Sequence, residues 1–290
     1  MKNIGFIGLG NMGLEMAINL KKSEYNVTGF DINKNMYKRL NALNINTSNN
    51  IKNIFETNEI ILTMLPDGKA VDKVYSENLK YASKNTLIVD CSTIDIETTI
   101  KIHNLAKNLK MLSLDAPVSG GVSGAKAASL TFMIGGKERV YKLMLPIFNA
   151  MGGKSIFCGQ ESSGQAVKIC NNLILAISMI ATGEAIILAK KLNLDLTKLY
   201  EVTSTSSASC WAINNYFPVA NIGPVSPADN NFEAGFSVNL MKKDLSLALN
   251  SIKDNKNMLH FGELALDKYS KMCDEGFGNL DFSAVIKNYK

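Results

Sequence analysis

Residues 4–13 have the sequence IGFIGLGNMG, and this stretch decides the fold of the first half of the chain. The apolar run 4–7 predicts a buried strand, and residues 12–22 have the apolar spacing of a helix. Between them lies the pattern G-x-G-x-x-G. In a strand–turn–helix unit, Gly8 permits the tight turn, Gly10 lets a pyrophosphate approach the backbone, and Gly13 lets helix and strand pack closely. The stretch therefore predicts a dinucleotide-binding βαβ unit, and the alternative is a purely structural glycine turn.

Asp31 bears on which dinucleotide is bound. It follows the second predicted strand, Asn26–Phe30, where a carboxylate accepts hydrogen bonds from the adenosine ribose hydroxyls. A carboxylate there repels the 2′-phosphate of NADP, and no arginine occurs in residues 32–35. We therefore expect NAD as the cofactor, with NADP less favoured, and Lys34 is the residue that keeps NADP open.

Further apolar runs predict strands at residues 60–65, 86–90, 111–115 and 130–134, alternating with helices. Such alternation predicts a parallel sheet covered on both faces, with ligands at the carboxyl ends of its strands. Leu65-Pro66 and Cys91-Ser92-Thr93 end two of these strands, so we expect both loops to contact the cofactor, Thr93 through its hydroxyl. The alternative for each loop is a simple capping turn.

Residues 115–124, DAPVSGGVSG, leave another predicted strand. Serine and glycine this dense at a strand end favour a concave nest of backbone N–H groups that binds a carboxylate. No arginine follows Arg139, so a substrate carboxylate must be held by hydroxyls, backbone N–H groups or lysine. The alternative is a flexible loop.

A long apolar helix is predicted from Gly164 to Leu192, buried between two domains. Lys168 lies in its first turns, where the positive end of the helix dipole favours the neutral amine. A neutral amine is a general base for an alcohol, and Asn172, four residues on, shares its face. Gly164 is expected to leave room there for a ligand. The alternative is a lysine whose ammonium reaches solvent.

The remaining sequence predicts helices at 195–203, 238–254, 259–274 and 282–289, with a loop at 217–235 that covers a site. Residues 240–245, LMKKDL, put lysines in the first turns of a helix, where the dipole disfavours them. This indicates either a functional cluster or an ordinary surface helix.

Composition excludes several classes of function. The chain has 290 residues, of which 46% are hydrophobic and 20% charged, as in a globular protein of about two domains. Five cysteines without a C-x-x-C pair argue against disulfides and structural zinc, and two separated histidines argue against a histidine-bound metal or a Ser-His-Asp triad. We therefore expect no metal.

The net charge of +5 is scattered, which argues against nucleic-acid binding. With no leader before residue 4 and no membrane span expected, the prediction is a cytoplasmic protein.

Four motifs together give the chain a family resemblance. IGLGNMG at 7–13 is similar to the cofactor signature of the β-hydroxyacid dehydrogenases, and DAPVSGG at 115–121 to their substrate motif. GQAVKICNN at 164–172 is similar to their catalytic motif G-x-x-x-K-x-x-N-N, and LMKKDL at 240–245 to their L-M-x-K-D-L. The resemblance covers essentially the whole chain.

The resemblance implies an α/β fold: a Rossmann-type domain at 1–163, an interdomain helix at 164–193 and an all-helical C-terminal domain at 194–290, in a homodimer or homotetramer. It implies that Lys168 and Asn172 are catalytic. It also implies a substrate site of Ser119, Gly120, Gly121, Phe236, Lys243 and Asp244. With the loops above, the cofactor site comprises Gly8, Leu9, Gly10, Asn11, Met12, Gly13, Asp31, Leu65, Pro66, Thr93 and Lys243.

Two stretches favour one subgroup. Residues 209–218, with Trp211 and Tyr216, and residues 227–236 resemble the members that oxidise 3-hydroxyisobutyrate to methylmalonate semialdehyde with NAD, a step of valine breakdown. Alternatives are a sibling enzyme acting on tartronate, glyoxylate or succinate semialdehyde, and a non-catalytic NAD(H)-binding module. The chain departs from the family at Ala128, where glycine is frequent, and at Ala234, where Gly-Gly-Phe is common.

Overall fold

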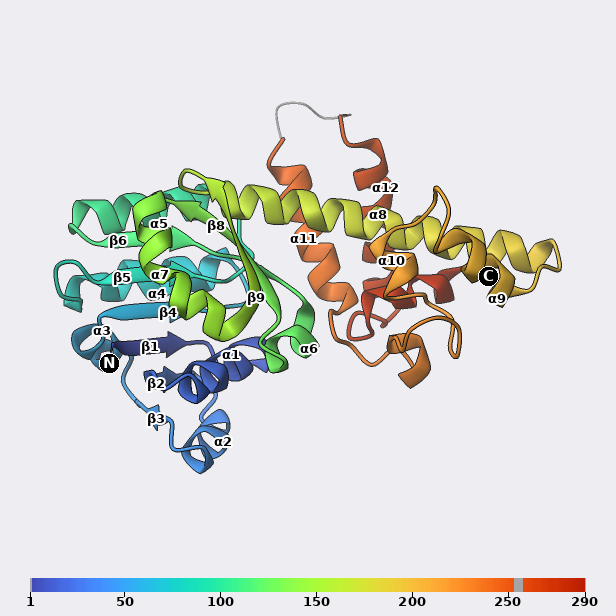
Figure 1. Cartoon of the computed structure of the whole chain (residues 1–290). Coiled ribbons are helices and arrows are strands. Elements are labelled where there is room, and N and C mark those ends of the chain that lie inside the picture. The colour runs from blue at the N-terminus through green and yellow to red at the C-terminus, as the bar shows by residue number, and fades with distance from the viewer. Residues whose placement is uncertain (1, 253–257, 290) are drawn as a thin grey trace. The chain divides into compact units, whose positions relative to one another are not determined.

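The computed structural model describes residues 2–252 and 258–289, and the chain divides into two compact units, Met1–Lys168 and Ile169–Lys290. The first unit is a Rossmann-type α/β unit and the second is helical in its described residues, as Figure 1 shows, which confirms the predicted fold class. The division falls within helix α8 (Ser163–Lys191), whose bounds lie within one residue of the helix predicted at 164–192.

The first unit is built on a nine-stranded sheet. Its strand order is β3-β2-β1-β4-β5-β6-β8-β7, and β9 pairs with β8. The strands are β1 (Asn3–Ile7), β2 (Asn26–Phe30), β3 (Asn46–Thr47), β4 (Ile60–Thr63), β5 (Leu87–Asp90), β6 (Leu112–Asp115), β7 (Val118–Ser119), β8 (Leu130–Gly136) and β9 (Gly152–Gly159).

The sheet is mixed, so the prediction of an all-parallel sheet is wrong at one edge. Strands β1 to β6 pair in parallel, but β8 runs antiparallel to both β6 and β7. The chain returns from β6 to β8 through only β7 and the short helix α6 (Gly121–Lys126), and an antiparallel neighbour needs no long crossover. The parallel pair β8–β9 does have a crossover helix, α7 (Glu138–Met151).

Helices cover both faces of this sheet. On one face α1 (Asn11–Lys22), α6 and α7 share a core with Ile4 and Phe6 of β1. On the other face α3 (Ile51–Thr57), α4 (Gly68–Asn78) and α5 (Ile96–Asn108) share a core with Ile7. Strand β1 is therefore buried on both sides, which explains its continuous apolar sequence. The short helices α2 (Met36–Ala42) and η1 (Leu79–Tyr81) complete the unit.

In the second unit α8 is followed by helices near the predicted positions. They are α9 (Leu196–Thr203), α10 (Trp211–Asn214), η2 (Pro227–Asn230), α11 (Val238–Asn250), α12 (His260–Asp274) and η3 (Phe282–Asn288). Met179, Met241 and Tyr269 are fully buried at its core. Two details differ from the prediction: η2 interrupts the loop expected at 217–235, and η3 is a 3₁₀ helix. Residues 253 and 254, expected at the end of a helix, lie outside the described residues.

Helix α8 alone, among the described helices, is long and apolar enough to cross a membrane, with a mean hydropathy of 1.9 over 18 residues. The less apolar residues Thr182, Gly183 and Glu184, which were expected to break the apolar stretch, lie within the continuous helix. Ala176, Met179 and Ile186 are nevertheless completely buried, so α8 serves as a core helix.

Candidate functional site

The glycine-rich turn lies between β1 and α1. Gly8 has φ +92°, and a Cβ there would collide with the carbonyl of Met64. A Cβ at Gly13 would collide with the carbonyl of Gly8 and the ring of Phe6, whereas a Cβ at Gly10 would meet nothing within 4 Å. Protein atoms therefore fill the space beside Gly8 and Gly13. Open space remains beside Gly10, at the N-terminus of α1. That combination fits a bound pyrophosphate.

Asp31 is tied to this turn. Its Oδ2 accepts a hydrogen bond from the backbone N–H of Leu9 at 2.6 Å, and its Oδ1 accepts one from Asn33 N at 2.7 Å. Lys34 Nζ donates to the carbonyl of Asp31 at 3.1 Å and to the Tyr37 hydroxyl at 2.9 Å. The carboxylate is therefore fixed beside the glycine turn, with one lysine held next to it. Asn11 and Met12 open α1 on the other side of the turn.

The two loops expected to contact the cofactor are bonded to each other. The Ser92 hydroxyl accepts from Leu65 N at 2.8 Å and donates to Asp90 Oδ1 at 2.6 Å. The same oxygen accepts from the Thr63 hydroxyl at 2.7 Å, and burial nonetheless raises the pKa of Asp90. These bonds bring the Leu65-Pro66 turn and the loop carrying Thr93 together at the carboxyl ends of β4 and β5.

The predicted carboxylate nest lies where β7 meets α6. Ser119 pairs with Thr131 of β8, so this part of the expected loop is a strand. Gly120 and Gly121 follow with φ +131° and +62°, and Gly120 is exposed at the N-terminus of α6. Both glycines thus adopt conformations that residues with side chains rarely adopt.

The predicted catalytic pair shares one face of α8. Lys168 and Asn172 are 6% and 2% exposed. Asn172 Nδ2 donates to Asp244 Oδ2, and its Oδ1 accepts from Asn171 at 2.9 Å. Lys243 Nζ lies 3.3 Å from Asp244 Oδ1. Asp244 of the LMKKDL motif is therefore bonded to the side-chain amide of Asn172. The motif is not an ordinary surface helix, because this bond is buried.

Gly164 does not leave room for a ligand, contrary to expectation. A Cβ at this position would collide with the carbonyl of Met133 and approach Asp115 Oδ2 at 2.8 Å. Its missing side chain lets the first turn of α8 pack directly on β8.

Aromatic residues of the subgroup motifs meet in the second unit. Trp211 lies 4.8 Å from Tyr216 between ring centroids, and both Tyr216 and Phe236 contact Phe282. The Tyr216 hydroxyl donates to the buried Asp281 Oδ2 at 3.1 Å, which also accepts from the backbone N–H of Phe236. Burial raises the pKa of both Asp281 and Tyr216. Asp281 thus holds the segment that carries Phe236.

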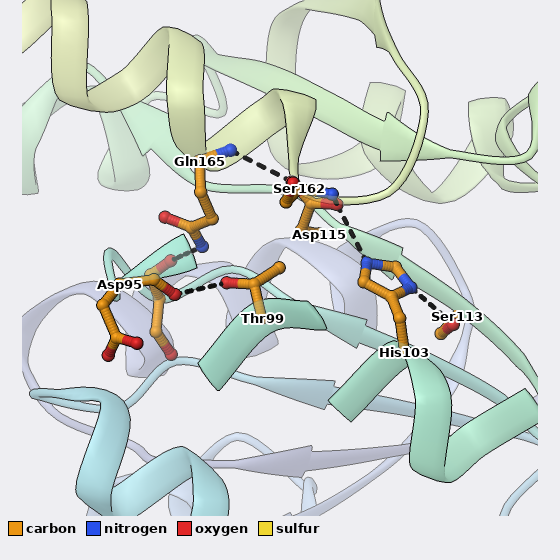
Figure 2. A network of polar contacts seen from close by, with 8 residues as sticks. Asp95, Thr99, His103, Ser113, Asp115, Ser162 and Gln165 are labelled. Carbon is orange, nitrogen blue, oxygen red and sulfur yellow. Dashed lines mark hydrogen bonds and ion pairs between the residues drawn. The ribbon is translucent and has the colours of Figure 1, made fainter. Parts of the chain in front are cut away.

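Sequence reasoning missed a buried polar network around Asp115 (Figure 2). Ser113, His103 and Asp115 form a hydrogen-bonded series in the order of a hydrolytic triad. The adjoining cavity measures ≈ 10 Å³, about the space of one water molecule, so no substrate reaches these groups. Within residues 2–252 and 258–289, no three His, Cys, Asp or Glu side chains gather as metal ligands do.

Comparison with known proteins agrees with this geometry. Residues 3–159 match the family model described as the NAD binding domain of 6-phosphogluconate dehydrogenase. Residues 162–289 match the model described as NAD-binding of NADP-dependent 3-hydroxyisobutyrate dehydrogenase. The chain is thus covered by two nucleotide-binding dehydrogenase families.

Individual relatives give the same result. The chain is 41% identical over 286 residues to a probable 3-hydroxyisobutyrate dehydrogenase of Mycobacterium tuberculosis, covering 99% of this chain and 97% of the relative. It is 40% identical to the mitochondrial 3-hydroxyisobutyrate dehydrogenase of Drosophila melanogaster, covering 98% and 88%. The solved M. tuberculosis 3-hydroxyisobutyrate dehydrogenase with L-serine matches with a TM-score of 0.95 at 40% identity, covering 100% of this chain and 99% of that one. The chain is therefore an oxidoreductase that belongs to the 3-hydroxyisobutyrate dehydrogenase family of β-hydroxyacid dehydrogenases.

Proposed function

We propose that this protein oxidises 3-hydroxyisobutyrate to methylmalonate semialdehyde with NAD, using Lys168 as the general base. The observation that carries the proposal is the polar face of α8, where Lys168 is followed one turn later by the buried, hydrogen-bonded Asn172. The names of relatives about 40% identical to this chain supply the substrate.

Each proposed role follows from chemistry. The backbone N–H groups at Ser119–Gly121 hold the substrate carboxylate, and Lys168 Nζ takes the proton of the hydroxyl group. In the reverse direction its ammonium donates a proton to the carbonyl oxygen. A bound nicotinamide dinucleotide supplies the hydride acceptor. We propose that the substrate site is completed by Asn172, Phe236, Lys243 and Asp244. Lys243 is also proposed to contact the cofactor.

Asp31 supports NAD over NADP. Its carboxylate is fixed beside the glycine turn by Leu9 N, where it repels a 2′-phosphate. Lys34, the nearest candidate ligand for that phosphate, already contacts the Tyr37 hydroxyl and lies 4.7 Å from the centre of the Phe30 ring. The proposed dinucleotide contacts are the glycine turn, the Leu65-Pro66 turn and Thr93.

We further propose a cytoplasmic homodimer or homotetramer that binds neither nucleic acid nor membrane and acts in valine breakdown. Two apolar side chains of α8, Ile174 and Leu188, and Leu192 directly after the helix are 60% or more exposed, and their spacing is that of one helix face. An exposed apolar stripe of this kind is typical of an interface between copies of a chain. Light scattering on the wild type and on Leu188→Glu tests the assembly, because the charge should shift it to a smaller species.

The decisive experiment measures NADH formation with each enantiomer of 3-hydroxyisobutyrate, beside 3-hydroxypropionate, L-serine and glycerate. Lys168→Ala should lower kcat at least about 100-fold, as expected for loss of a general base. Lys190→Ala, an exposed lysine of the same helix, is the matched control and should retain activity. Because the neutral amine is the base, the wild-type oxidation rate should rise with pH.

Other outcomes point to the alternatives. If the protein only reduces tartronate, glyoxylate or succinate semialdehyde, the role of Lys168 stands and the proposed substrate is wrong. Dinucleotide binding with no turnover of any acid would indicate a non-catalytic NAD(H)-binding module.

A further inference from the structure

Asp115 accepts hydrogen bonds from two backbone N–H groups at the start of α8. Its Oδ1 accepts from Ser162 N at 2.8 Å, and its Oδ2 accepts from Gln165 N at 3.0 Å (Figure 2). The carboxylate is 1% exposed. The first N–H groups of a helix have no partner within the helix, and a negative charge there also interacts favourably with the helix dipole. Asp115, at the end of β6, therefore caps the helix that carries Lys168.

His103 fixes this carboxylate from α5. Its Nε2 lies 3.0 Å from Asp115 Oδ1, and its Nδ1 lies 2.7 Å from the Ser113 hydroxyl. With both ring nitrogens bonded, the imidazole has one orientation, and it holds Asp115 Oδ1 in place beside Ser162 N. The imidazole is 5% exposed, so solvent does not compete for these bonds.

The Gln165 side chain makes a second attachment, to the loop after β5. Its Nε2 donates to the carbonyl of Ser92 at 2.7 Å, and its Oε1 accepts from Ile94 N at 3.2 Å. The fully buried Gln165 amide thus bonds to the backbone of the residues on both sides of Thr93. The first turn of α8 is attached to the ends of two adjacent strands, β5 and β6, while Gly164 lets it lie directly on β8.

We propose that Asp115, His103 and Gln165, here called the α8 anchor, position Lys168 against the loop that contains Thr93. Lys168 follows Gln165 by three residues, less than one helical turn, so a shift of the first turn shifts the lysine. We assign the anchor residues as positioning residues, because their side chains are 5% or less exposed and their polar atoms bond to other protein groups. A displacement of about 1 Å in a reacting group can cost about 100-fold in rate.

The α8 anchor also joins motifs that the sequence presents separately. Asp115 begins the DAPVSGG motif, and four residues later Ser119 ends β7. The Asp115 carboxylate therefore both begins the proposed substrate-binding motif and caps α8, the helix that carries the proposed base Lys168. This inference rests on the proposed function, in which Lys168 carries the proton.

The test compares Asp115→Asn, His103→Gln and His103→Ala with the wild type. In Asp115→Asn one accepting oxygen becomes a donor facing a backbone N–H, so the first turn of α8 should shift. We expect kcat to fall 10- to 100-fold, while the KM of the hydroxy acid and the Kd of NADH stay within threefold.

His103→Gln keeps a donor toward Asp115 and should retain most of kcat, whereas His103→Ala should lower kcat five- to tenfold. Asp195→Asn, which alters the capping carboxylate of α9, is the control and should leave kcat unchanged.

Hydrogen exchange of a peptide spanning residues 162–168 gives a readout independent of turnover. Asp115→Asn and His103→Ala should accelerate exchange there, and His103→Gln should not. Unchanged kcat and unchanged exchange in Asp115→Asn would overturn the inference, as would equal losses in both His103 variants. If the wild type oxidises no 3-hydroxy acid, the proposed function fails, and the exchange data alone still decide whether Asp115 anchors α8. The His103 pair keeps the test valid should Asp115→Asn fail to fold.

Discussion

The side-chain amide of Asn172 donates a hydrogen bond to the carboxylate of Asp244, 72 residues further along the chain. Both side chains are 2% exposed, so the bond is protected from water. It joins α8 to α11, and Lys243 adds an ion pair to the other carboxylate oxygen at 3.3 Å. Asp244 therefore supports Asn172, in addition to any contact with substrate.

This pair can be tested by exchanging its members. Asn172→Asp places two carboxylates together in a buried site and should lower the free energy of unfolding by about 3 kcal/mol. The double variant Asn172→Asp with Asp244→Asn restores an amide–carboxylate bond in the reverse sense and should recover at least half of that loss. Urea denaturation of the wild type, both single variants and the double variant measures the coupling. Strictly additive losses would contradict a direct interaction.

The glycine turn yields a matched pair of variants with opposite effects. A Cβ at Gly10 enters open space, so Gly10→Ala should keep the wild-type Tm and weaken NADH binding at least tenfold. A Cβ at Gly13 meets the Gly8 carbonyl and the Phe6 ring, so Gly13→Ala should destabilise by about 1–3 kcal/mol through overpacking. Thermal unfolding and NADH fluorescence separate the two. Equal changes in Tm for both variants would refute the assignment.

Asp31 should control the choice between NAD and NADP. Asp31→Asn removes the charge that repels a 2′-phosphate and keeps an oxygen for the Leu9 N–H, while it loses the bond that Oδ1 accepts from Asn33 N. We expect the ratio of kcat/KM for NADP to that for NAD to rise at least tenfold. Asn33→Ala, which leaves the carboxylate in place, serves as control. An unchanged ratio in Asp31→Asn would mean that another group selects the cofactor.

Local pattern predicted the first βαβ unit because its glycines have steric roles that depend on few other residues. The edge of the sheet escaped prediction for the opposite reason. Strand β9 begins with Gly152 and Gly153 and is only partly buried, so it lacks the continuous apolar run of β1. The antiparallel direction of β8 depends on the path of the chain through α6, and the periodicity of apolar residues carries no such information.

The candidate site divides in the same way. Helical spacing alone places Lys168 and Asn172 on one face. The bond from Gln165 N to Asp115 spans 50 residues, and it forms only because β6 ends beside the start of α8. An acidic residue at the end of a buried strand was the one available signal, and the sequence does not show which donors it meets.

Asp90 should give the protein a pH-dependent stability. Burial raises the pKa of this carboxyl above its ordinary value, so ionising it costs more in the folded state than in the unfolded state. The stability that the protonated Asp90 carboxyl contributes is complete below its pKa in the unfolded state. It is lost as pH rises through its pKa in the folded state. Asp90→Asn cannot ionise and keeps an oxygen for Ser92 and Thr63. The difference in Tm between Asp90→Asn and the wild type should therefore move in favour of the variant between pH 4 and pH 8. A constant difference over that range would show that Asp90 does not titrate there.

Ala128 carries backbone strain that a single substitution should relieve. Helix α6 ends with Ser129 N bonded to Gly124 O at 2.9 Å and Ala128 N bonded to Ala125 O at 3.3 Å, the two bonds of a Schellman motif. This motif requires a left-handed residue, and Ala128 has φ +51°. The conformation costs an L-residue about 1–2 kcal/mol, whereas glycine loses about 0.5–1 kcal/mol of extra chain entropy on folding.

Ala128→Gly should therefore stabilise the protein by up to about 1 kcal/mol, raising Tm by about 2–4 °C. Ala127→Gly is the matched control, because Ala127 has φ −81° and gains nothing from glycine. That variant should lower stability by about 0.5–1 kcal/mol. Differential scanning calorimetry of the two variants decides the question. If both lower Tm equally, the left-handed residue is not strained, and the departure from the family at this position has no energetic consequence.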